Sequence, residues 1–552
     1  KNTTLAMLPR ARQLALIAVK LRRISSKMVL ERSTRAAATS ATVSAAAKPA
    51  PQNQQQPPIV LGKQPEHTTP PESHNETYEN AVHALNSLQS NYSVMQSSIA
   101  RTHTSDSVHI QETVKFLGRI GISPERLDQL PVIHVSGTKG KGSTCSLVES
   151  ILRAHGYRTG FFSSPHLVAV TERIRMDGTP IEPDHFTAHF WRVYNRLLAT
   201  RDHPRDMPAY FNFLTILAFD IFLRAKVDVA VVEVGVGGRY DCTNAVRGTR
   251  TVGITSLGLE HTKLLGETLE EIAWQKAGIV KEGSDVFTVR QPEGCLDVIA
   301  SECRKLGANL QVVPDFDDYQ WQRKPALSAN NLAIKLNTSL AIQIALNWIG
   351  RTRPELLTKK GVLSEQVAQG VESCFWPGRC HQVRKGNKRI FLDGAHTVES
   401  VELCAKWFQS CQRKGNPKVL VFNATGDRDT HKLLEILGKN VNFDRVYFTP
   451  NVASLKSTNV DSVNLNFPKD EQLKRCEQNC QLWQELQSRR NGTSKVQSPA
   501  QALAAVGLAL EQIENHFATT RQECDILVTG SLHLIGAALT ALNMESHVLC
   551  PR

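Results

Sequence analysis

The stretch Ile133-His134-Val135-Ser136-Gly137-Thr138-Lys139-Gly140-Lys141-Gly142-Ser143-Thr144 decides the fold class of this 552-residue chain. An apolar run over 131–135 leads into a glycine-rich turn, and a helical pattern follows over 144–155. Consecutive backbone N–H groups in such a turn form a concave site for phosphate oxygens, and the N-terminus of the next helix adds a favourable potential. The strict pattern G-x-x-x-x-G-K-[ST] is not met, because Val135 replaces its first glycine and Gly142 separates Lys141 from Ser143. The stretch predicts a phosphate-binding loop, with Lys141 on the terminal phosphates and a hydroxyl on Mg²⁺, or alternatively a plain glycine turn.

Strands and helices alternate along the chain outward from this loop. Near-continuous Val, Ile and Leu runs are typical of parallel strands that are buried on both faces. Because ligands in such sheets gather at the carboxyl ends of the strands, the polar turns after these runs are candidate sites. The expected strands cover 132–135, 227–234, 251–256, 389–392, 419–422 and 525–528, and further helical patterns cover 268–277 and 364–373.

The length exceeds what one hydrophobic core holds, so more than one domain is expected. The pattern predicts a central α/β domain over 78–375 and a smaller α/β domain over 376–552, with a boundary near Phe375-Trp376-Pro377-Gly378. The stretch 454–498 is polar and has few strand signals, so it is predicted to be a mobile insertion. No run of 18 or more apolar residues occurs, and no membrane-spanning segment is expected.

The net charge of +13 comes mainly from the N-terminus. Residues 1–50 hold ten Lys and Arg but one acid, Glu31, and the charge on the rest is too small and too dispersed for a nucleic-acid-binding surface. An amphipathic, Arg- and Ser-rich leader predicts a mitochondrial transit peptide over 1–47, with a disordered basic tail as the alternative. A Pro- and Gln-rich linker is expected over 48–77. The predicted compartment is the matrix, and Met28 offers a second start for a cytosolic form without the leader.

The cysteine pattern is that of a reduced compartment. Twelve cysteines are scattered without C-x-x-C spacing, so free thiols are expected. Cys476 and Cys480 are four residues apart, but no matching His/Cys pair supports a zinc site.

A carboxylate ends one of the expected buried strands. Glu233 closes an apolar run and precedes Gly235, Gly237 and Gly238. A carboxylate in such a place is costly unless it meets a cation. A metal ion is the simplest partner, and an ion pair with Arg239 or another basic residue is the alternative.

Two further polar groups follow the strand expected at 251–256. A neutral imidazole such as His261 is a good metal ligand once its second nitrogen is oriented, and Glu260 is a nearby candidate for that orienting role. A loop histidine without a special function is the alternative. Lys276 would repel Mg²⁺ as an ordinary lysine, and it is then expected on a solvated helix face.

The ordered motifs of this chain together resemble the folylpolyglutamate synthase family, whose members are relatives of the Mur ligases. The resemblance spans about residues 78–542, and the eukaryotic branch fits best. Its motifs are HVSGTKGKGST (134–144), GFFSSPHL (160–167), VEVGVGGRYDCTN (232–244), HTKLLG (261–266), IAWQKAGI (272–279), WPGR (376–379), LDGAHT (392–397), FNATGDRD (422–429) and VTGSLHL (528–534).

This resemblance implies a fold and an activity. The fold is an α/β, P-loop-containing, Mur-ligase-like ATPase domain with a mainly parallel sheet, followed by a smaller Rossmann-like α/β domain. The activity is an ATP-dependent ligation of L-glutamate to the γ-carboxylate of folates (tetrahydrofolate and its polyglutamates) through an acyl phosphate. ATP, two Mg²⁺ ions and a monovalent cation are the implied cofactors, and a monomer without a nucleic-acid partner is expected.

The family's roles carry over position by position. Ser164, Glu233 and His261 match its Mg²⁺ ligands, and Lys276 matches a lysine that family members carbamylate with CO₂, which makes it an anionic ligand. Arg173 matches a position for the incoming glutamate. Lys141, His261 and Lys276 would be catalytic, and the nucleotide contacts are matched by Gly140, Lys141, Gly142, Ser143, Asn337, Arg379, Asp393 and His396.

Two positions depart from the family pattern. Glu260 stands where an Asp usually precedes the ligand His, and it is one methylene longer. Thr397 stands where many bacterial relatives have Asn, and a Thr here matches the eukaryotic pattern. Three alternatives remain. The first is a dihydrofolate synthase, which uses the same chemistry on dihydropteroate. The others are a Mur-type cell-wall ligase, which would be odd behind a mitochondrial leader, and a P-loop regulatory ATPase that ligates nothing.

Overall fold

The structure is a computed structural model that describes residues 76–89, 108–327, 331–358, 361–424, 428–455, 461, 469–491, 499–518 and 522–550. Residues 71–552 form one compact unit, distinct from residues 1–70. The predicted transit peptide and all but the last two residues of the predicted linker lie outside the described residues, as do residues 425–427 of one motif.

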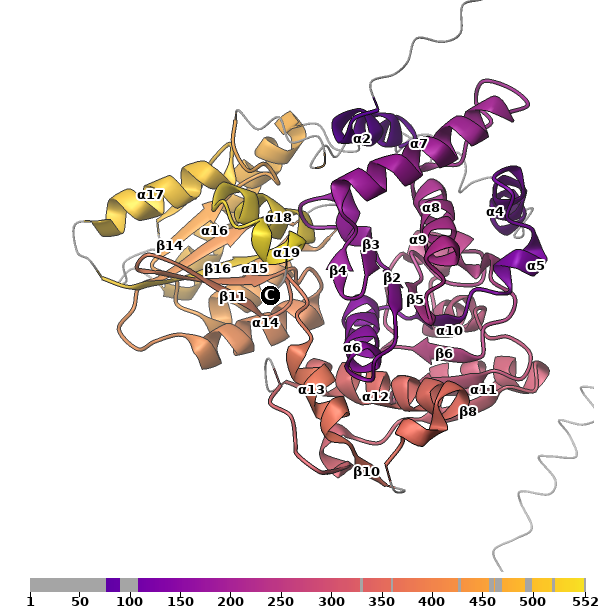
Figure 1. Cartoon of the computed structure of the whole chain (residues 1–552). Coiled ribbons are helices and arrows are strands. Elements are labelled where there is room, and N and C mark those ends of the chain that lie inside the picture. The colour runs from indigo at the N-terminus through magenta and orange to yellow at the C-terminus, as the bar shows by residue number, and fades with distance from the viewer. Residues whose placement is uncertain are drawn as a thin grey trace, which may run out of the picture. The chain divides into compact units, whose positions relative to one another are not determined.

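The predicted phosphate loop follows a central strand of an eight-stranded sheet (Figure 1). That strand, β1 (Val132–Ser136), pairs in parallel with β5 (Val229–Glu233) and β6 (Thr251–Ile254). The strand order is β4-β3-β2-β5-β1-β6-β7-β8; β3 runs antiparallel to β2 and β4, and the other pairings are parallel. The remaining strands are β2 (Thr159–Phe162), β3 (Ile174–Met176), β4 (Thr179–Pro180), β7 (Asp285–Thr288) and β8 (Asn309–Val312).

Alternate residues of the buried strands fill separate cores on the two faces of this sheet. Val132 and Ala230 belong to one core, whereas Ile133 and Val231 belong to another. Because both faces are covered, these strands have continuous apolar runs. The helices are α2 (Tyr78–Ser87), α4 (Val108–Arg119), α5 (Pro124–Leu127), α7 (Pro183–Ala199) and α8 (Tyr210–Ala225) at the first core, α6 (Lys141–Ala154), α12 (Leu332–Thr352) and α13 (Glu365–Ser373) at the second, and α9 (Thr262–Leu265), α10 (Leu269–Ala277) and α11 (Cys295–Lys305) beyond β6.

Among the described helices, α12 has the length and apolar composition of a membrane span. Half of the 18-residue window that meets this criterion is buried inside the protein. Leu340, Ile344 and Ile349 of α12 belong to the same core as α6. The apolar composition of α12 is thus what its place in a covered α/β layer requires.

A second sheet of six strands follows in the chain. Its order is β11-β12-β16-β13-β14-β15, with β11 antiparallel to β12 and the other pairings parallel. Helices cover both faces, which gives two further cores. The strands are β11 (His381–Lys385), β12 (Lys388–Asp393), β13 (Lys418–Phe422), β14 (Arg445–Phe448), β15 (Ala500–Ala502) and β16 (Cys524–Thr529), and the helices are α14 (Val398–Cys411), α15 (Thr430–Asn440), α16 (Lys469–Asn491), α17 (Val506–Ala518), α18 (Leu532–Ala541) and α19 (Ser546–Leu549).

The two sheets meet at the turn after β2. Leu167 and Val168 of this turn pack into a core of the second sheet, although they precede that sheet by more than 200 residues. At Gly536 of α18, an added Cβ would lie 1.8 Å from the carbonyl oxygen of Leu167. The turn that carries Ser164 is therefore fixed to both sheets.

The predicted fold class and all six expected strands are confirmed. They are β1, β5, β6, β12, β13 and β16, and they lie at the centres of the two sheets. The sequence pattern missed the short or outer strands, such as β2, which has four residues, and β8, whose side chains are largely exposed. All twelve cysteines are free, as expected. The domain boundary near residue 376 stays a prediction.

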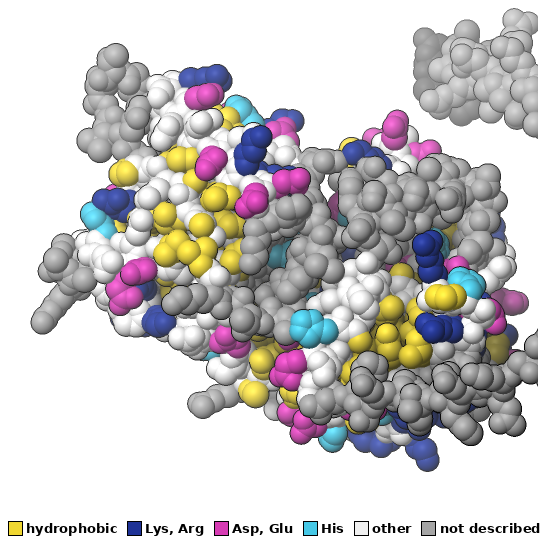
Figure 2. Space-filling model, turned by 90° about the horizontal axis from the view of Figure 1, so that it is seen from above, with side chains coloured by type: hydrophobic (Ala, Val, Ile, Leu, Met, Phe, Trp, Pro, Cys, Tyr) yellow, Lys and Arg dark blue, Asp and Glu magenta, His cyan; other side chains and the backbone are white. Residues whose placement is uncertain are grey.

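Charged side chains are mixed on the surface that Figure 2 shows. Described Lys and Arg side chains lie among Asp and Glu over most of this face and do not gather into one basic stripe. Hydrophobic side chains form patches between them.

The segment predicted to be a mobile insertion contains a packed helix. Residues 469–491 form α16, whose Cys476 and Trp483 are buried in a core of the second sheet. The ring of Trp483 lies edge-on to Phe443, with centroids 6.2 Å apart. The sequence pattern missed this helix because few apolar residues carry its packing in a strongly polar stretch. Residues 456–460, 462–468 and 492–498 lie outside the described residues.

Replacement of Trp483 tests this packing. We expect Trp483→Ala to lower the free energy of unfolding by about 3–5 kcal/mol, as for other large side chains removed from a core. Urea unfolding followed by circular dichroism measures the change. The matched control is Glu485→Ala on an exposed face of the same helix. Equal unfolding midpoints for the two variants would contradict a packed α16.

Candidate active site

The turn between β1 and α6 leaves no room for a side chain at two of its glycines. Gly137 has φ 142°, and an added Cβ would lie 1.8 Å from Oγ1 of Thr255. Gly140 has φ 90°, and an added Cβ would lie 2.1 Å from Oδ1 of Asn337 on α12. The chain therefore turns tightly into α6, whose first-turn N–H groups have no acceptor within the helix.

Two lysines reach the same oxygen of this turn. The Nζ atoms of Lys141 and Lys276 donate to the carbonyl oxygen of Gly137 at 3.2 and 2.8 Å. The expected solvated position of Lys276 is wrong, because this side chain on α10 is only 3% exposed. Burial, and then the charge of Lys141, lowers the pKa of Lys276 to about 7. A large share of its amine is therefore neutral at physiological pH.

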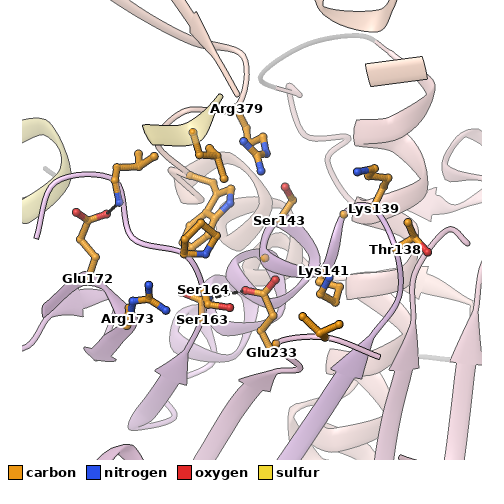
Figure 3. Close-up of a pocket in the computed structure, with 18 of the residues that line it drawn as sticks. Thr138, Lys139, Lys141, Ser143, Ser163, Ser164, Glu172, Arg173, Glu233 and Arg379 are labelled. Atoms are coloured by element: carbon orange, nitrogen blue, oxygen red, sulfur yellow. Dashed lines mark hydrogen bonds between the residues drawn. The ribbon is translucent and has the colours of Figure 1, made fainter. Parts of the chain in front are cut away.

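Glu233 faces the first turn of α6 (Figure 3). It ends β5 and is buried, and its Oε2 accepts a hydrogen bond from the backbone N–H of Ser164 at 3.2 Å. An added Cβ at Gly142 would lie 3.2 Å from the same oxygen. Burial raises the pKa of this carboxyl group. The alternative ion pair with Arg239 is not formed, because Arg239 pairs with Glu302 at 2.5 Å.

A cavity of about 520 Å³ opens between these groups. Three of the thirteen predicted site residues lie just behind its wall: Asn337 against Gly140, Lys276 against Gly137, and Asp393 beneath the loop of Arg379. The other ten line it: Gly140, Lys141, Gly142, Ser143, Ser164, Arg173, Glu233, His261, Arg379 and His396. Residues that are far apart in the sequence thus come together at one place.

Asp393 supports the loop that carries Arg379. Its two carboxylate oxygens accept the backbone N–H groups of Cys380 at 2.8 Å and Ala395 at 2.9 Å. Asp393 is 8% exposed, and burial raises its pKa. Arg379 itself lines the cavity. A direct contact of Asp393 with a nucleotide stays a prediction.

Arg173 is held in place at the cavity wall. Its Nε donates to Nδ1 of His166 at 2.9 Å, and its guanidinium lies over the ring of Tyr210, 5.4 Å from the ring centroid. Because Nδ1 of His166 is an acceptor, the network assigns the proton to Nε2, which faces the carbonyl oxygen of Asp461 at 3.3 Å. A buried, oriented guanidinium at a cavity suits a carboxylate of a ligand.

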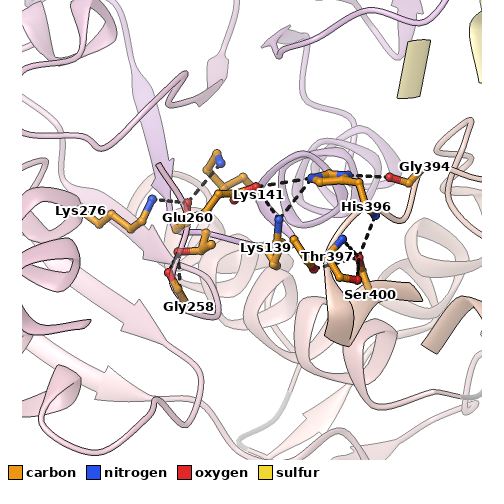
Figure 4. Close-up of polar contacts among 11 residues, drawn as sticks. Lys139, Lys141, Gly258, Glu260, Lys276, Gly394, His396, Thr397 and Ser400 are labelled. Carbon is orange, nitrogen blue, oxygen red and sulfur yellow. Dashed lines mark hydrogen bonds and ion pairs between the residues drawn. The ribbon is translucent and has the colours of Figure 1, made fainter. Parts of the chain in front are cut away.

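Lys139 forms a polar network that the sequence pattern did not indicate (Figure 4). Its Nζ lies 2.7 Å from Oε1 of Glu260 and 3.3 Å from Nε2 of His396. The carboxylate of Glu260 thus contacts Lys139 and His396, and the expectation that it orients His261 is wrong. The backbone N–H of Lys139 donates to the carbonyl oxygen of Ser256 at 3.1 Å. The network joins the phosphate loop to the turn after β6 and to the second sheet.

Two further residues at the cavity were missed. Arg175 is 4% exposed, lines the cavity and lies over the ring of Trp376, 5.0 Å from the ring centroid. The carboxylate of Glu172 accepts three backbone N–H groups of the turn that follows Ser164. The sequence alone did not indicate them, because the charged residues around Ile174 are typical of an exposed segment and their burial is known only from the structure.

The side chains that could donate to a metal ion decide which metal suits the site. Among the described residues, no group of three or more His, Cys, Asp or Glu side chains is placed to hold a metal ion. Mg²⁺ needs fewer protein ligands, because it keeps several waters and binds through one or two carboxylates together with phosphate oxygens. Glu233 and Ser164 at the phosphate loop fit that requirement.

Comparisons with known proteins agree with this arrangement. Residues 379–541 match the family model described as dihydrofolate synthetase, C-terminal domain. The Homo sapiens protein named folylpolyglutamate synthase, mitochondrial, is 42% identical over 74% of this chain and 74% of its own length. The Bos taurus protein of the same name is 38% identical over 84% and 92%. A solved structure of E. coli FolC in complex with DHPP and ADP is 25% identical and covers 83% of this chain and 98% of its own, with a TM-score of 0.59.

The buried Lys276 makes stability depend on pH. In the unfolded chain a lysine has a pKa of about 10.4, whereas the pKa of folded Lys276 is about 7. Between these values the unfolded state binds a proton that the folded state does not, so this group makes the free energy of unfolding rise with pH. We expect Lys276→Met to be more stable than the wild type at pH 7 and to lose that advantage toward pH 10.

Urea unfolding at a series of pH values measures this difference. The matched control is Lys414→Met, which removes an exposed lysine and is expected to give a difference that does not change with pH. A pH-independent difference for Lys276→Met would contradict the lowered pKa.

Proposed function

The chain belongs to the folylpolyglutamate synthase family, and on that premise we propose that it is an ATP-dependent ligase that adds L-glutamate to the γ-carboxylate of folates. The observation that carries the proposal is the convergence on one cavity of a glycine turn at a helix N-terminus, the buried Glu233 and the cation Arg379 from the second sheet. Relatives named folylpolyglutamate synthase support the folate, and the ADP named with E. coli FolC supports the nucleotide. Such a ligase retains folates for one-carbon metabolism.

The reaction has to activate a carboxylate. A carboxylate is a poor electrophile, because attack by an amine must expel an oxide. Transfer of the γ-phosphoryl group of ATP to the carboxylate gives an acyl phosphate and ADP; the amine of glutamate then bonds to the carbonyl carbon, and phosphate leaves. Lys141 and the first-turn N–H groups of α6 would hold the phosphate oxygens and stabilise the charge that develops on them. The cavity would shield the acyl phosphate from water.

The metal ligands are part of the proposal. Ser164 and Glu233 would hold one Mg²⁺ at the phosphate loop, and His261 with a modified Lys276 would hold a second. Mg²⁺ supplies neutralisation of the phosphate charge when it is bound. A monovalent cation is a further expectation from the family.

Lys276 is suited to the carbamylation that we propose. Its neutral amine, favoured by a pKa of about 7, can attack CO₂ through nitrogen; the N–C bond forms and the nitrogen releases a proton. The product is an anion, which removes the repulsion between Lys276 and Lys141 at the carbonyl of Gly137. Asn337 and His396 would complete the nucleotide site, and Arg173 would hold a carboxylate of the incoming glutamate.

The names of the relatives support a mitochondrial compartment for this protein. The human and bovine proteins are named mitochondrial, which supports a mitochondrial protein here. We further propose a matrix location, a cytosolic form that starts at Met28, and a monomer.

A substrate panel tests the activity. The family model that matches residues 379–541 carries the name dihydrofolate synthetase, so dihydropteroate is the second candidate acceptor. We expect ADP release that requires both glutamate and tetrahydrofolate, with a product heavier by one glutamate in mass spectrometry. Release with dihydropteroate as the sole acceptor would identify a dihydrofolate synthase instead. Release that needs neither acceptor nor glutamate would point to an ATPase.

Replacement of Lys276 tests the carbamate. We expect Lys276→Ala to lower kcat by roughly 10²–10³, the cost of removing one electrostatic group from a site of this kind, while circular dichroism shows an unchanged fold. Wild-type protein incubated with ¹³C-bicarbonate should show a carbamate carbon resonance that Lys276→Ala lacks. Full activity of the variant, or the same resonance in both proteins, would refute the carbamate.

A further inference from the structure

Lys139 and Glu260, which both contact His396, have no role in the proposed function. Lys139 lies on the phosphate loop, two residues before Lys141 and on the other side of Gly140. All three network residues line the cavity. Their side chains are partly exposed to solvent, at 35% for Lys139, 23% for Glu260 and 19% for His396.

The hydrogen bonds show which atoms of this network donate a proton and which accept one. Nδ1 of His396 lies 2.7 Å from the carbonyl oxygen of Gly394, so it must carry the ring proton and donate. Burial lowers the pKa of His396, which favours the neutral ring. Nε2 is then an acceptor, and the ammonium of Lys139 at 3.3 Å donates to it. A second N–H of Lys139 donates to Oε1 of Glu260 at 2.7 Å.

Among the residues that the structure describes, one donor of Lys139 remains for a ligand. An ammonium has three N–H groups, and the contacts with Glu260 and His396 use two of them. The backbone on either side of the side chain is fixed as well, since the N–H groups of Thr138 and Lys139 both donate to the carbonyl oxygen of Ser256 at 3.1 Å. The ammonium is therefore held at the cavity before any ligand arrives, so little rotational freedom is lost on binding.

The three residues come from three segments of the chain. Lys139 follows β1, and Glu260 follows β6, in the first sheet. His396 follows β12 of the second sheet, and its backbone N–H donates to Oγ of Ser400 at the start of α14 at 3.0 Å. The ammonium of Lys139 is thus a contact between the phosphate loop and the loop that follows Asp393 at the end of β12.

We propose that Lys139 is a second phosphate-binding cation of the site and that it places His396, and with it the second sheet, on the bound nucleotide. This inference rests on the proposed function for the identity of the ligand, a nucleoside triphosphate. Glu260 is a positioning residue, which holds the ammonium where its third N–H meets the phosphates. Lys139 and Lys141 then bind the polyphosphate from the two sides of Gly140.

The test measures nucleotide affinity directly. In the full chain, we expect Lys139→Met to weaken the Kd of a non-hydrolysable ATP analogue by about tenfold or more, because a hydrogen bond to a charged group is lost. Lys139→Arg keeps the charge and should restore most of the affinity. The matched control is Lys439→Met on α15, which removes a lysine that is also 2.7 Å from a glutamate but far from the cavity, and should leave the Kd unchanged.

Two further readouts separate this role from mere support of the fold. The KM for ATP should rise in Lys139→Met while the KM for glutamate stays within about twofold. Lys139→Met and His396→Ala should be non-additive in analogue affinity, because the second change removes a contact that the first has already lost. If Lys139→Met does not fold, Lys139→Gln, which keeps a donor, replaces it in the same measurements.

Three results would overturn the inference: an unchanged Kd for the ATP analogue, equal rises of the KM values for all substrates, or fully additive effects in the double variant. These results are separable from a failure of the proposed function. If the wild type binds the ATP analogue but ligates no glutamate to folate, the proposed acceptor is wrong, and the Kd of Lys139→Met still decides the role of Lys139.

Discussion

The carbonyl oxygen of Gly137 accepts hydrogen bonds from both Lys141 and Lys276, and the electrostatics of the site follow from this shared acceptor. Burial imposes a desolvation cost on the ammonium of Lys276, and the charge of Lys141 at the same oxygen adds repulsion. The pKa of Lys276 falls in response, and the buried carboxylate of Glu233 faces the same turn. Lys141, Arg173 and Arg379 also line the cavity, and cations of this kind suit the oxygens of a polyphosphate.

The fold presents these groups on rigid supports. The carboxyl ends of β1, β5 and β6 deliver the phosphate loop, Glu233 and His261 to one edge of the first sheet. The carboxylate of Asp393 ties the loop before β11 to the loop after β12, which fixes Arg379 from the side of the second sheet. Side chains that are held in this way need little rearrangement when a ligand binds.

The central strands and the phosphate loop could be predicted because their signals are local. A strand covered on both faces has to be apolar throughout, and a turn as tight as that at Gly140 excludes side chains. The partners of Lys139 and Glu260 could not be predicted in this way, because a loop residue's neighbours depend on how separate segments meet in space. Glu260 was assigned to His261 as its neighbour in sequence, whereas its carboxylate meets Lys139 and His396.

Helix α16 was missed for a different reason. Its composition is mostly polar, and only a few buried residues, such as Trp483, pack it against the second sheet. Lys276 is an intermediate case. Its place in a motif pointed to the site, but a lysine's ordinary preference for solvent pointed away from it, and the structure settles its burial. The carbamylation that we propose for it is a reaction with CO₂, and no side-chain pattern in the sequence encodes such a reaction.

The turn after β2 belongs to two cores at once. Ser164 faces Glu233 in the first sheet, while Leu167 and Val168, a few residues later, are anchored in the second, with main chain against main chain at Gly536. Main-chain atoms that meet without a side chain between them adjust less than long side chains do. The turn is therefore stiff. A rotation of the second sheet would displace Ser164 almost as far as it displaces Leu167 and Val168.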